Sequence, residues 1–223
     1  MSVTAPATAP RSAAAGTPLT RYRADLERDD FQYDPAQERA VEHLQHLYGQ
    51  LLASPRSEPL SVTTGRGLKS RVAGLFGKRE KVAEPKAPAI RGLYFWGGVG
   101  RGKTYLVDTF YESLPFSDKL RTHFHRFMQR VHNELEHYKG QKNPLTLIAA
   151  KFAAEARVIC FDEFFVTDIT DAMILGTLME ELFSNGVVLV ATSNIVPDGL
   201  YKDGLQRARF LPAIALLKEH TEV

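Results

Sequence analysis

The feature that most constrains the fold of this chain is a glycine-rich segment between an apolar run and a helical pattern. Residues 97–104 read GGVGRGKT, which matches the phosphate-binding pattern G-x-x-x-x-G-K-[ST]. The apolar run Leu93–Trp96 precedes them, and Leu106, Phe110 and Leu114 follow with the spacing of one helix face. Because strand, loop and helix come in the order that the pattern requires, the sequence predicts an α/β fold rather than a turn with a chance Lys-Thr pair.

The chemistry of phosphate explains the residue types in this segment. Backbone N–H groups wrap phosphate oxygens, the following helix adds the positive end of its dipole, and glycines let the backbone approach without a Cβ in the way. We expect Lys103 to reach the β- and γ-phosphates and the Thr104 hydroxyl to ligate Mg²⁺. The predicted nucleotide-binding residues are Gly97, Gly98, Val99, Gly100, Arg101, Gly102, Lys103 and Thr104.

Two carboxylates follow a second apolar run. Residues 158–161 read VICF, which is typical of a buried parallel strand, and Asp162 and Glu163 come directly after them. Ligands of open α/β sheets bind at this end of the strands. We expect Asp162 to hold Mg²⁺, directly or through water, and Glu163 to polarise an attacking water, which favours hydrolysis over phosphoryl transfer to a second substrate. The alternative is a helix N-terminus carrying acidic residues, which is also a stabilising arrangement.

A third apolar run supplies a candidate sensor of the γ-phosphate. Residues 187–191 read VVLVA, and Thr192, Ser193 and Asn194 follow. We expect the Asn194 amide, at the end of a core strand, to hydrogen-bond the attacking water or the γ-phosphate. The alternative is a turn residue that caps the next segment.

Two arginines come after this third strand, Arg207 and Arg209. The default interpretation is a pair of charges on a surface helix. The functional interpretation is an arginine finger that enters the site of a neighbouring subunit, where such a residue raises the rate by about 10³–10⁵.

Length and composition are those of one larger domain with additional ends. The chain has 223 residues, 44% of them hydrophobic, and a formal net charge of +2. So small a charge gives no argument for nucleic acid. The single cysteine, Cys160, lies in an expected buried strand and cannot form an intramolecular disulfide, which fits a reducing compartment. No apolar run approaches the roughly 18 residues that indicate a membrane span.

The sequence divides into three parts. Residues 1–20 are rich in Ala, Thr, Pro and Ser, and we expect a disordered tail. Residues 21–90 are expected to form an N-terminal helical segment, with Asp34 as a helix cap and Pro35 in the first turn, followed by a basic linker. Residues 91–223 are expected to form the P-loop core.

The linker carries eight Lys or Arg residues against three Glu over residues 56–86. Within it, four apolar residues have helical spacing among basic neighbours: Leu68, Val72, Leu75 and Phe76. Such a stretch either lies on a membrane or an acidic partner, or forms a short helix packed on its own domain.

The region between the two candidate sites predicts a short strand at 119–124, a helix over about 125–138 and a second helix over 144–155. Its closely spaced histidines, His123 and His125, do not indicate a metal site, because no third ligand or cysteine cluster lies near them in the sequence.

Several segments together resemble one family. They are residues 92–104 (GLYFWGGVGRGKT), 123–128 (HFHRFM) with Val131 and His132, 160–169 (CFDEFFVTDI), 191–194 (ATSN) and 204–212 (GLQRARFLP). With these segments in this order over about residues 20–223, the chain resembles the ZapE-type family of bacterial cell-division AAA+ ATPases, which has mitochondrial relatives.

The resemblance implies a fold, a reaction and roles for particular residues. The fold is an ASCE-type P-loop NTPase with a three-layer αβα core and parallel strand order 5-1-4-3-2. The reaction is ATP hydrolysis with Mg²⁺. The residues implied at the metal are Thr104 and Asp162, and those implied in catalysis are Lys103, Glu163, Asn194 as sensor 1, and Arg207 as the finger. Arg209 is the second choice for the finger.

The resemblance also implies partners and a location. Members are expected to form homo-oligomers in which a neighbour's arginine completes each site. Bacterial members are associated with the division ring protein FtsZ, and mitochondrial members with quality control of inner-membrane proteins. We therefore expect a cytoplasmic protein at the division site or the inner face of the membrane, with peripheral membrane contact and no nucleic-acid partner. Phe127 and Met128 follow the second strand, where AAA+ proteins can place a substrate-facing pore loop; core residues are the alternative.

The chain departs from the family pattern at its end. It stops at Val223, whereas family members continue into the rest of the core and a helical lid with the sensor-2 arginine. We therefore expect the lid to be missing and nucleotide affinity and assembly to be weakened. Two competing functions stay open. One is a nucleotide-dependent binding adaptor with little hydrolysis. The other is a nucleic-acid loader, against which the small net charge and the lack of an aromatic-basic patch argue.

Overall fold

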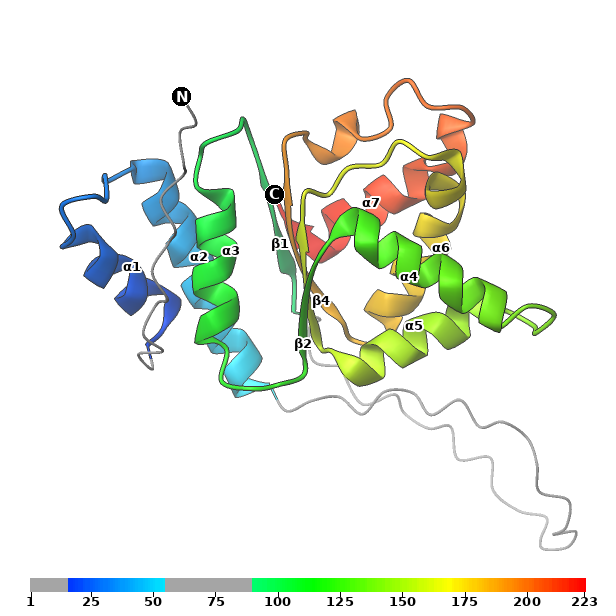
Figure 1. The fold of residues 1–223 in the computed structure, drawn as a ribbon, viewed down its shortest axis with the longest axis horizontal. Coiled ribbons are helices and arrows are strands. Elements are labelled where there is room, and N and C mark those ends of the chain that lie inside the picture. Colours follow the sequence, from blue (N-terminus) through cyan, green and yellow to red (C-terminus); the bar gives the residue numbers. More distant parts are fainter. Residues whose placement is uncertain (1–15, 55–89) are drawn as a thin grey trace, which may run out of the picture.

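The computed structural model describes residues 16–54 and 90–223 and places a five-stranded sheet between two layers of helices (Figure 1). The strands are β1 (Gly92–Trp96), β2 (Lys119–His123), β3 (Val158–Asp162), β4 (Val188–Ser193) and β5 (Thr221–Glu222). Their order is β2-β3-β4-β1-β5, and every neighbouring pair is parallel. The predicted parallel core with strand order 5-1-4-3-2 is therefore confirmed.

Helices cover both faces of this sheet (Figure 1). On one side lie α1 (Pro18–Leu26), α2 (Pro35–Ala53) and α3 (Lys103–Ser113). On the other side lie α4 (Phe124–His137), α5 (Pro144–Glu155), α6 (Ile169–Ser184) and α7 (Leu211–His220). Two short 3-10 helices, η1 (Pro197–Gly199) and η2 (Arg207–Arg209), lie between β4 and α7.

Successive side chains of β3 point to opposite faces of the sheet and join different cores. Val158 and Cys160 belong to the core shared with α1, α2 and α3. Ile159 and Phe161 belong to the core shared with α4, α5, α6 and α7. Because a parallel strand covered on both faces has no polar face, its sequence reads as a continuous apolar run.

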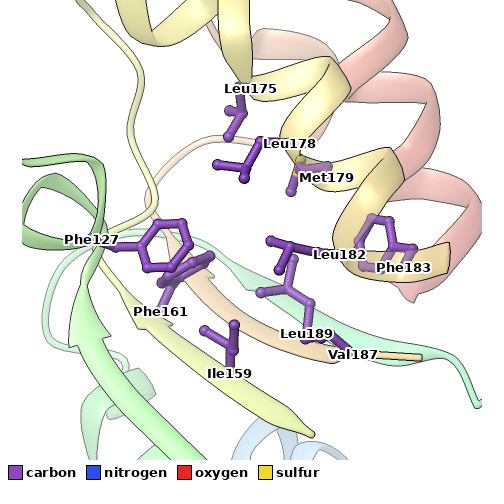
Figure 2. A pocket seen from close by; sticks show the side chains of 10 residues that line it. All are labelled: Phe127, Ile159, Phe161, Leu175, Leu178, Met179, Leu182, Phe183, Val187 and Leu189. Atoms are coloured by element: carbon purple, nitrogen blue, oxygen red, sulfur yellow. The ribbon is translucent and has the colours of Figure 1, made fainter. Parts of the chain in front are cut away.

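The second of these cores leaves a small cavity between α6 and the sheet, of about 10 Å³. Figure 2 shows the apolar side chains that face it: Phe127, Ile159, Phe161, Leu175, Leu178, Met179, Leu182, Phe183, Val187 and Leu189. A space of this size holds about one water at most and offers that water no polar partner. The cavity is therefore a packing gap and not a ligand site.

The N-terminal helical segment forms two helices with a break between them. The predicted start of the longer helix, α2, is confirmed: an Asp34 carboxylate oxygen accepts the Ala36 N–H at 2.8 Å, and Pro35 is the first helical residue. This arrangement satisfies a backbone donor that the helix leaves unpaired, with proline where its missing N–H costs nothing.

The shorter helix, α1, begins at Pro18, inside the segment that was expected to be a disordered tail, so that boundary was placed too late. The Thr17 hydroxyl accepts the Thr20 N–H and caps the helix, and the Tyr22 side chain is buried against α2 and α3. The cap and the buried ring both stabilise the helix, together with the bonds from Leu19 to Gln45 and from Arg21 to Glu112.

Some expectations concern residues 1–15 and 55–89, which the structure does not describe. The rest of the tail, most of the basic linker and the amphipathic stretch from Leu68 to Phe76 belong to these ranges and stay predictions. Among the helices of residues 16–54 and 90–223, none has the length and hydrophobicity needed to cross a membrane.

The pore-loop interpretation of Phe127 and Met128 is wrong. Helix α4 begins at Phe124, directly after β2, so no loop separates them. The two side chains are 2% and 1% exposed and pack in the core. The rings of His123 and His125 stack at 5.7 Å, and the described ranges hold no group of three His, Cys, Asp or Glu that could bind a metal.

Candidate nucleotide-binding site

Except for the candidate finger Arg207, the predicted site residues lie at one edge of the sheet. The glycine-rich loop follows β1, Glu163 follows β3, and Asn194 follows β4. These strands are parallel neighbours, with Phe95 opposite Thr192 and Cys160 opposite Val190, so their carboxyl ends point the same way. Open α/β sheets bind ligands at this edge.

The loop adopts backbone conformations that favour glycine. Gly100 has φ +84° and Gly102 has φ +74°, in the left-handed region where a side chain is strained. Gly102 also directly precedes α3, so the N–H groups of the first turn of α3 face the loop. The segment therefore has both parts of an anion site, a backbone cradle and a helix N-terminus.

Lys103 joins the loop to β4. Its ammonium group donates hydrogen bonds to the carbonyl oxygens of Gly97 at 2.5 Å and Gly98 at 2.8 Å, and to the Asn194 amide oxygen at 3.1 Å. Burial lowers the pKa of Lys103, and the charge of Arg101 lowers it further. Two of the predicted catalytic side chains are thus in direct contact, although 91 residues separate them in the sequence.

Asp162 is held by an arginine that the sequence interpretation missed. Both its carboxylate oxygens accept from Arg121 of β2, one from Nε at 2.9 Å and one from a terminal nitrogen at 3.2 Å. The other terminal nitrogen of Arg121 is bonded to Asp108 of α3. Asp108 lies one helical turn after Thr104. One feature of the sequence could have indicated this role: Arg121 is a charged residue in the middle of the strand predicted over residues 119–124.

Glu163 has a backbone held by β4 and a side chain that faces solvent. Its φ is +54°, a conformation uncommon outside glycine, and its N–H donates to the Thr192 hydroxyl at 3.2 Å. The next residue, Phe164, donates its N–H to the Thr192 carbonyl at 2.7 Å. The carboxylate is exposed, so a water can reach it.

The oxygen atoms of this site fit a magnesium ion. The Thr104 hydroxyl is exposed beside the loop, and the Asp162 carboxylate keeps lone pairs beyond those that accept from Arg121. Mg²⁺ prefers such oxygen ligands and usually takes others from water and phosphate. Among residues 16–54 and 90–223, no group of three His, Cys, Asp or Glu could hold a metal ion.

The two candidate fingers lie apart from these contacts. Arg207, in η2, is half-buried and donates to the Asp198 carbonyl at 2.7 Å, whereas Arg209 is exposed. Within residues 16–54 and 90–223, neither arginine has a hydrogen bond or ion pair to the loop, Asp162, Glu163 or Asn194. The structure of one chain therefore assembles the site without an arginine from η2.

Comparisons with known proteins identify relatives over nearly the whole chain. A family model described as AFG1-like ATPase matches residues 16–223. The chain is 54% identical over 207 residues to the cell division protein ZapE of Escherichia coli (strain K12), covering 93% of this chain and 53% of that protein. It is 44% identical over 157 residues to lactation elevated protein 1 homolog B of Danio rerio, covering 66% of this chain and 31% of that protein. The chain thus spans about half the length of ZapE and less of the Danio rerio protein.

Solved structures agree on the fold. The crystal structure of DnaI superposes with a TM-score of 0.52 at 13% sequence identity, covering 90% of this chain and 91% of that one. At this identity the likeness concerns the α/β fold alone.

Proposed function

The chain belongs to the AFG1-like ATPase family, and from this membership we propose that it binds ATP with Mg²⁺ and hydrolyses it to ADP and phosphate. The observation that carries the proposal is the 3.1 Å hydrogen bond from Lys103 to Asn194. It brings the phosphate-binding loop against the polar end of β4, the strand beside β3, which ends at Asp162 and is followed by Glu163.

Each residue of the site has its own role in hydrolysis. The backbone N–H groups of residues 97–104 bind the phosphates, and Lys103 neutralises charge on the β- and γ-phosphates. Thr104 and Asp162 hold Mg²⁺, which supplies further neutralisation of the phosphate charge. Asn194 is positioned to orient the γ-phosphate or the attacking water.

Glu163 activates the water. Its exposed carboxylate accepts a proton as the water oxygen bonds to the γ-phosphorus and the bond from that phosphorus to the bridging oxygen breaks. ADP then leaves with the electrons of the broken bond. The backbone bond from Glu163 to Thr192 keeps the carboxylate at the edge of the sheet.

Arg207 completes the site of a neighbouring copy in this proposal. It has to exchange its bond to the Asp198 carbonyl for a phosphate oxygen of that neighbour. Arg209, exposed two residues on, is the second candidate. This role makes a homo-oligomer the active form.

The cellular role in this proposal is to remodel or regulate a protein assembly during cell division, in the cytoplasm at the division site or the inner face of the membrane. Identity of 54% to a cell division protein supports it. FtsZ is the first candidate assembly, and quality control of membrane proteins is the alternative. The basic segment within residues 21–90 is the candidate for peripheral membrane contact.

One observation favours a second candidate function, a nucleotide-dependent adaptor with little hydrolysis. Both Asp162 oxygens already accept hydrogen bonds from the Arg121 guanidinium, a cation close to where the metal is expected. If this ion pair persists with nucleotide bound, metal binding is weaker and turnover is slow.

The proposal is tested by measuring phosphate release from ATP by the chain and by Lys103→Ala. We expect release to fall by about 10²-fold or more in the variant, because a preorganised charge is removed from the phosphates. Lys139→Ala is the matched control, since Lys139 is exposed and its ion pair with Glu136, at 3.8 Å, joins two exposed side chains. Release by Lys103→Ala at the rate of the control would contradict the proposal.

A further inference from the structure

A glutamine from α2 touches the phosphate-binding loop. The Gln37 side-chain nitrogen donates to the Arg101 carbonyl at 3.4 Å. A Cβ placed on Gly102 would lie 2.7 Å from the same nitrogen, so the amide packs directly on the loop backbone. The two partners are 64 residues apart in the sequence. None of the phosphate-binding roles assigned above uses this contact.

The contact with Arg101 sets which end of the amide is left without a partner. A backbone carbonyl accepts hydrogen bonds, so the nitrogen of Gln37 has to face it. The amide oxygen of Gln37 is buried and has no hydrogen-bond partner among residues 16–54 and 90–223. Buried acceptors in folded proteins are almost always paired, so an orphaned one beside a ligand site points to a donor that the ligand brings.

An aromatic ring lies close in sequence to this amide. Tyr33 is 57% exposed, and its hydroxyl donates to the Glu38 carboxylate at 2.6 Å. Glu38 is adjacent to Gln37 in the first turn of α2. The bond ties an exposed flat ring to the same helical turn that carries the unpaired oxygen. Aromatic faces of this kind stack on nucleobases.

We propose that Gln37 reads the base of the bound nucleotide and selects adenine over guanine, with Tyr33 covering one face of the base. The inference rests on the proposed function, because the phosphates must occupy the loop for the base to reach α2. The base of a nucleotide is one ribose away from its phosphates, and Gln37 contacts the loop at the residues directly before α3.

The chemistry of the two purines decides the selectivity. Adenine carries an exocyclic amine, which donates to the Gln37 oxygen, whereas guanine carries a carbonyl oxygen at the corresponding position, which repels it. The last torsion of a glutamine is broad, so a modest rotation turns the enclosed oxygen toward the ligand. The nitrogen keeps its hydrogen bond to the Arg101 carbonyl during this rotation, so the amide presents its oxygen and not its nitrogen to the base.

The test compares the affinities of fluorescent mant-ADP and mant-GDP, both with Mg²⁺, for the full chain and for Gln37→Ala. We expect the unaltered chain to bind the adenine nucleotide at least about tenfold more tightly. In Gln37→Ala the affinity for mant-ADP falls until the two nucleotides agree within about threefold, while the affinity for mant-GDP changes little. Gln50→Ala, an exposed glutamine on the same helix, keeps the preference of the unaltered chain.

The outcomes separate this inference from the function on which it rests. An adenine preference that survives in Gln37→Ala overturns the inference, as does equal binding of both nucleotides by the unaltered chain; either result leaves nucleotide binding intact. Failure of the unaltered chain to bind either nucleotide overturns the proposed function and the inference with it. Unchanged affinity of Gln37→Ala for mant-GDP shows that the variant is folded.

Discussion

Arg121 lies between the carboxylates of Asp162 and Asp108 and links the two parts of the site that carry them. Its guanidinium bonds both oxygens of Asp162 in β3 and one of Asp108 in α3. The side chains of Arg121 and Asp162 are 19% and 12% exposed, so their charges are only partly screened by water. The residue therefore ties the helix that begins at the phosphate-binding loop to the strand that carries the carboxylates.

Replacing Arg121 is expected to destabilise the fold as well as the site. We expect Arg121→Met to lower the free energy of unfolding by about 1–3 kcal/mol, because two carboxylates are left close together without a counter-charge. Urea unfolding followed by circular dichroism measures the change. Arg130→Met is the control: its partner Glu155 is 39% exposed, and we expect a loss below about 1 kcal/mol. Equal losses in the two variants would argue against a special role for Arg121.

Residues of the site differ in how far the sequence could predict them. The loop from Gly97 to Thr104 was predictable because its pattern and its structural context are local. Arg121 and Gln37 were not, since their partners lie 41 and 64 residues away and only the tertiary fold brings them together. The contact of Lys103 with Asn194 lies between these cases: both residues were predicted, but their hydrogen bond was not.

The predicted and observed helix starts agree best where a cap residue in the local sequence marks the start. The start of α2 was predicted from Asp34 and Pro35 alone. The start of α4 was placed one residue too late, because Phe124 was assigned to the preceding strand, which ends at His123. The start of α1 was missed, since its burial depends on contacts with α2 and α3.

The cap of α2 gives a direct prediction. Asp34→Ala is expected to lower the free energy of unfolding by about 1 kcal/mol, because a backbone N–H in the first turn loses its acceptor. Thermal or urea denaturation measures this. Asp29→Ala, which removes an exposed carboxylate from the turn before the helix, is expected to change stability by less than about 0.5 kcal/mol. An unchanged free energy of unfolding in Asp34→Ala would show that the capping hydrogen bond contributes nothing to stability.

The cap of α6 gives a prediction about pH. Hydrogen bonds from the backbone N–H groups of Thr170 and Asp171 lower the pKa of the Asp168 carboxyl below its ordinary value. The stabilisation from this cap is thus present above the pKa of the unfolded chain and is lost as the pH falls through the lower pKa of the folded chain. Carbon-detected NMR titration of Asp168 should give a midpoint below that of an unstructured peptide; a midpoint at or above that value would contradict the cap.

Residues 16–54 and 90–223 form one sheet with a core on each face, and the single cysteine of the chain lies in β3, an inner strand of that sheet. Cys160 of β3 is fully buried, and burial raises the pKa of its thiol to about 12. The parallel sheet was predictable from three apolar runs, one followed by the glycine-rich loop and two followed by polar residues. The order of the strands came from the resemblance to a family, because periodicity does not say which strands are neighbours.

Cys160 can report on the opening of this core. We expect it to resist iodoacetamide in the folded chain at neutral pH and to react at the rate of a free thiol in denaturant, because the thiolate is the nucleophile and neither solvent nor base reaches it when folded. Mass spectrometry of the alkylated protein measures the rate. Fast alkylation without denaturant would contradict the buried position of β3.

We propose that this site hydrolyses ATP by means of the carboxylate of Glu163, which follows β3. The most direct test measures ATP turnover and ATP affinity in the chain and in Glu163→Gln. We expect turnover to fall by at least about 10²-fold while the dissociation constant for ATP stays within about threefold, because the variant loses the proton acceptor but keeps the phosphate-binding loop. Turnover by Glu163→Gln at the rate of the unaltered chain would rule out this role of Glu163.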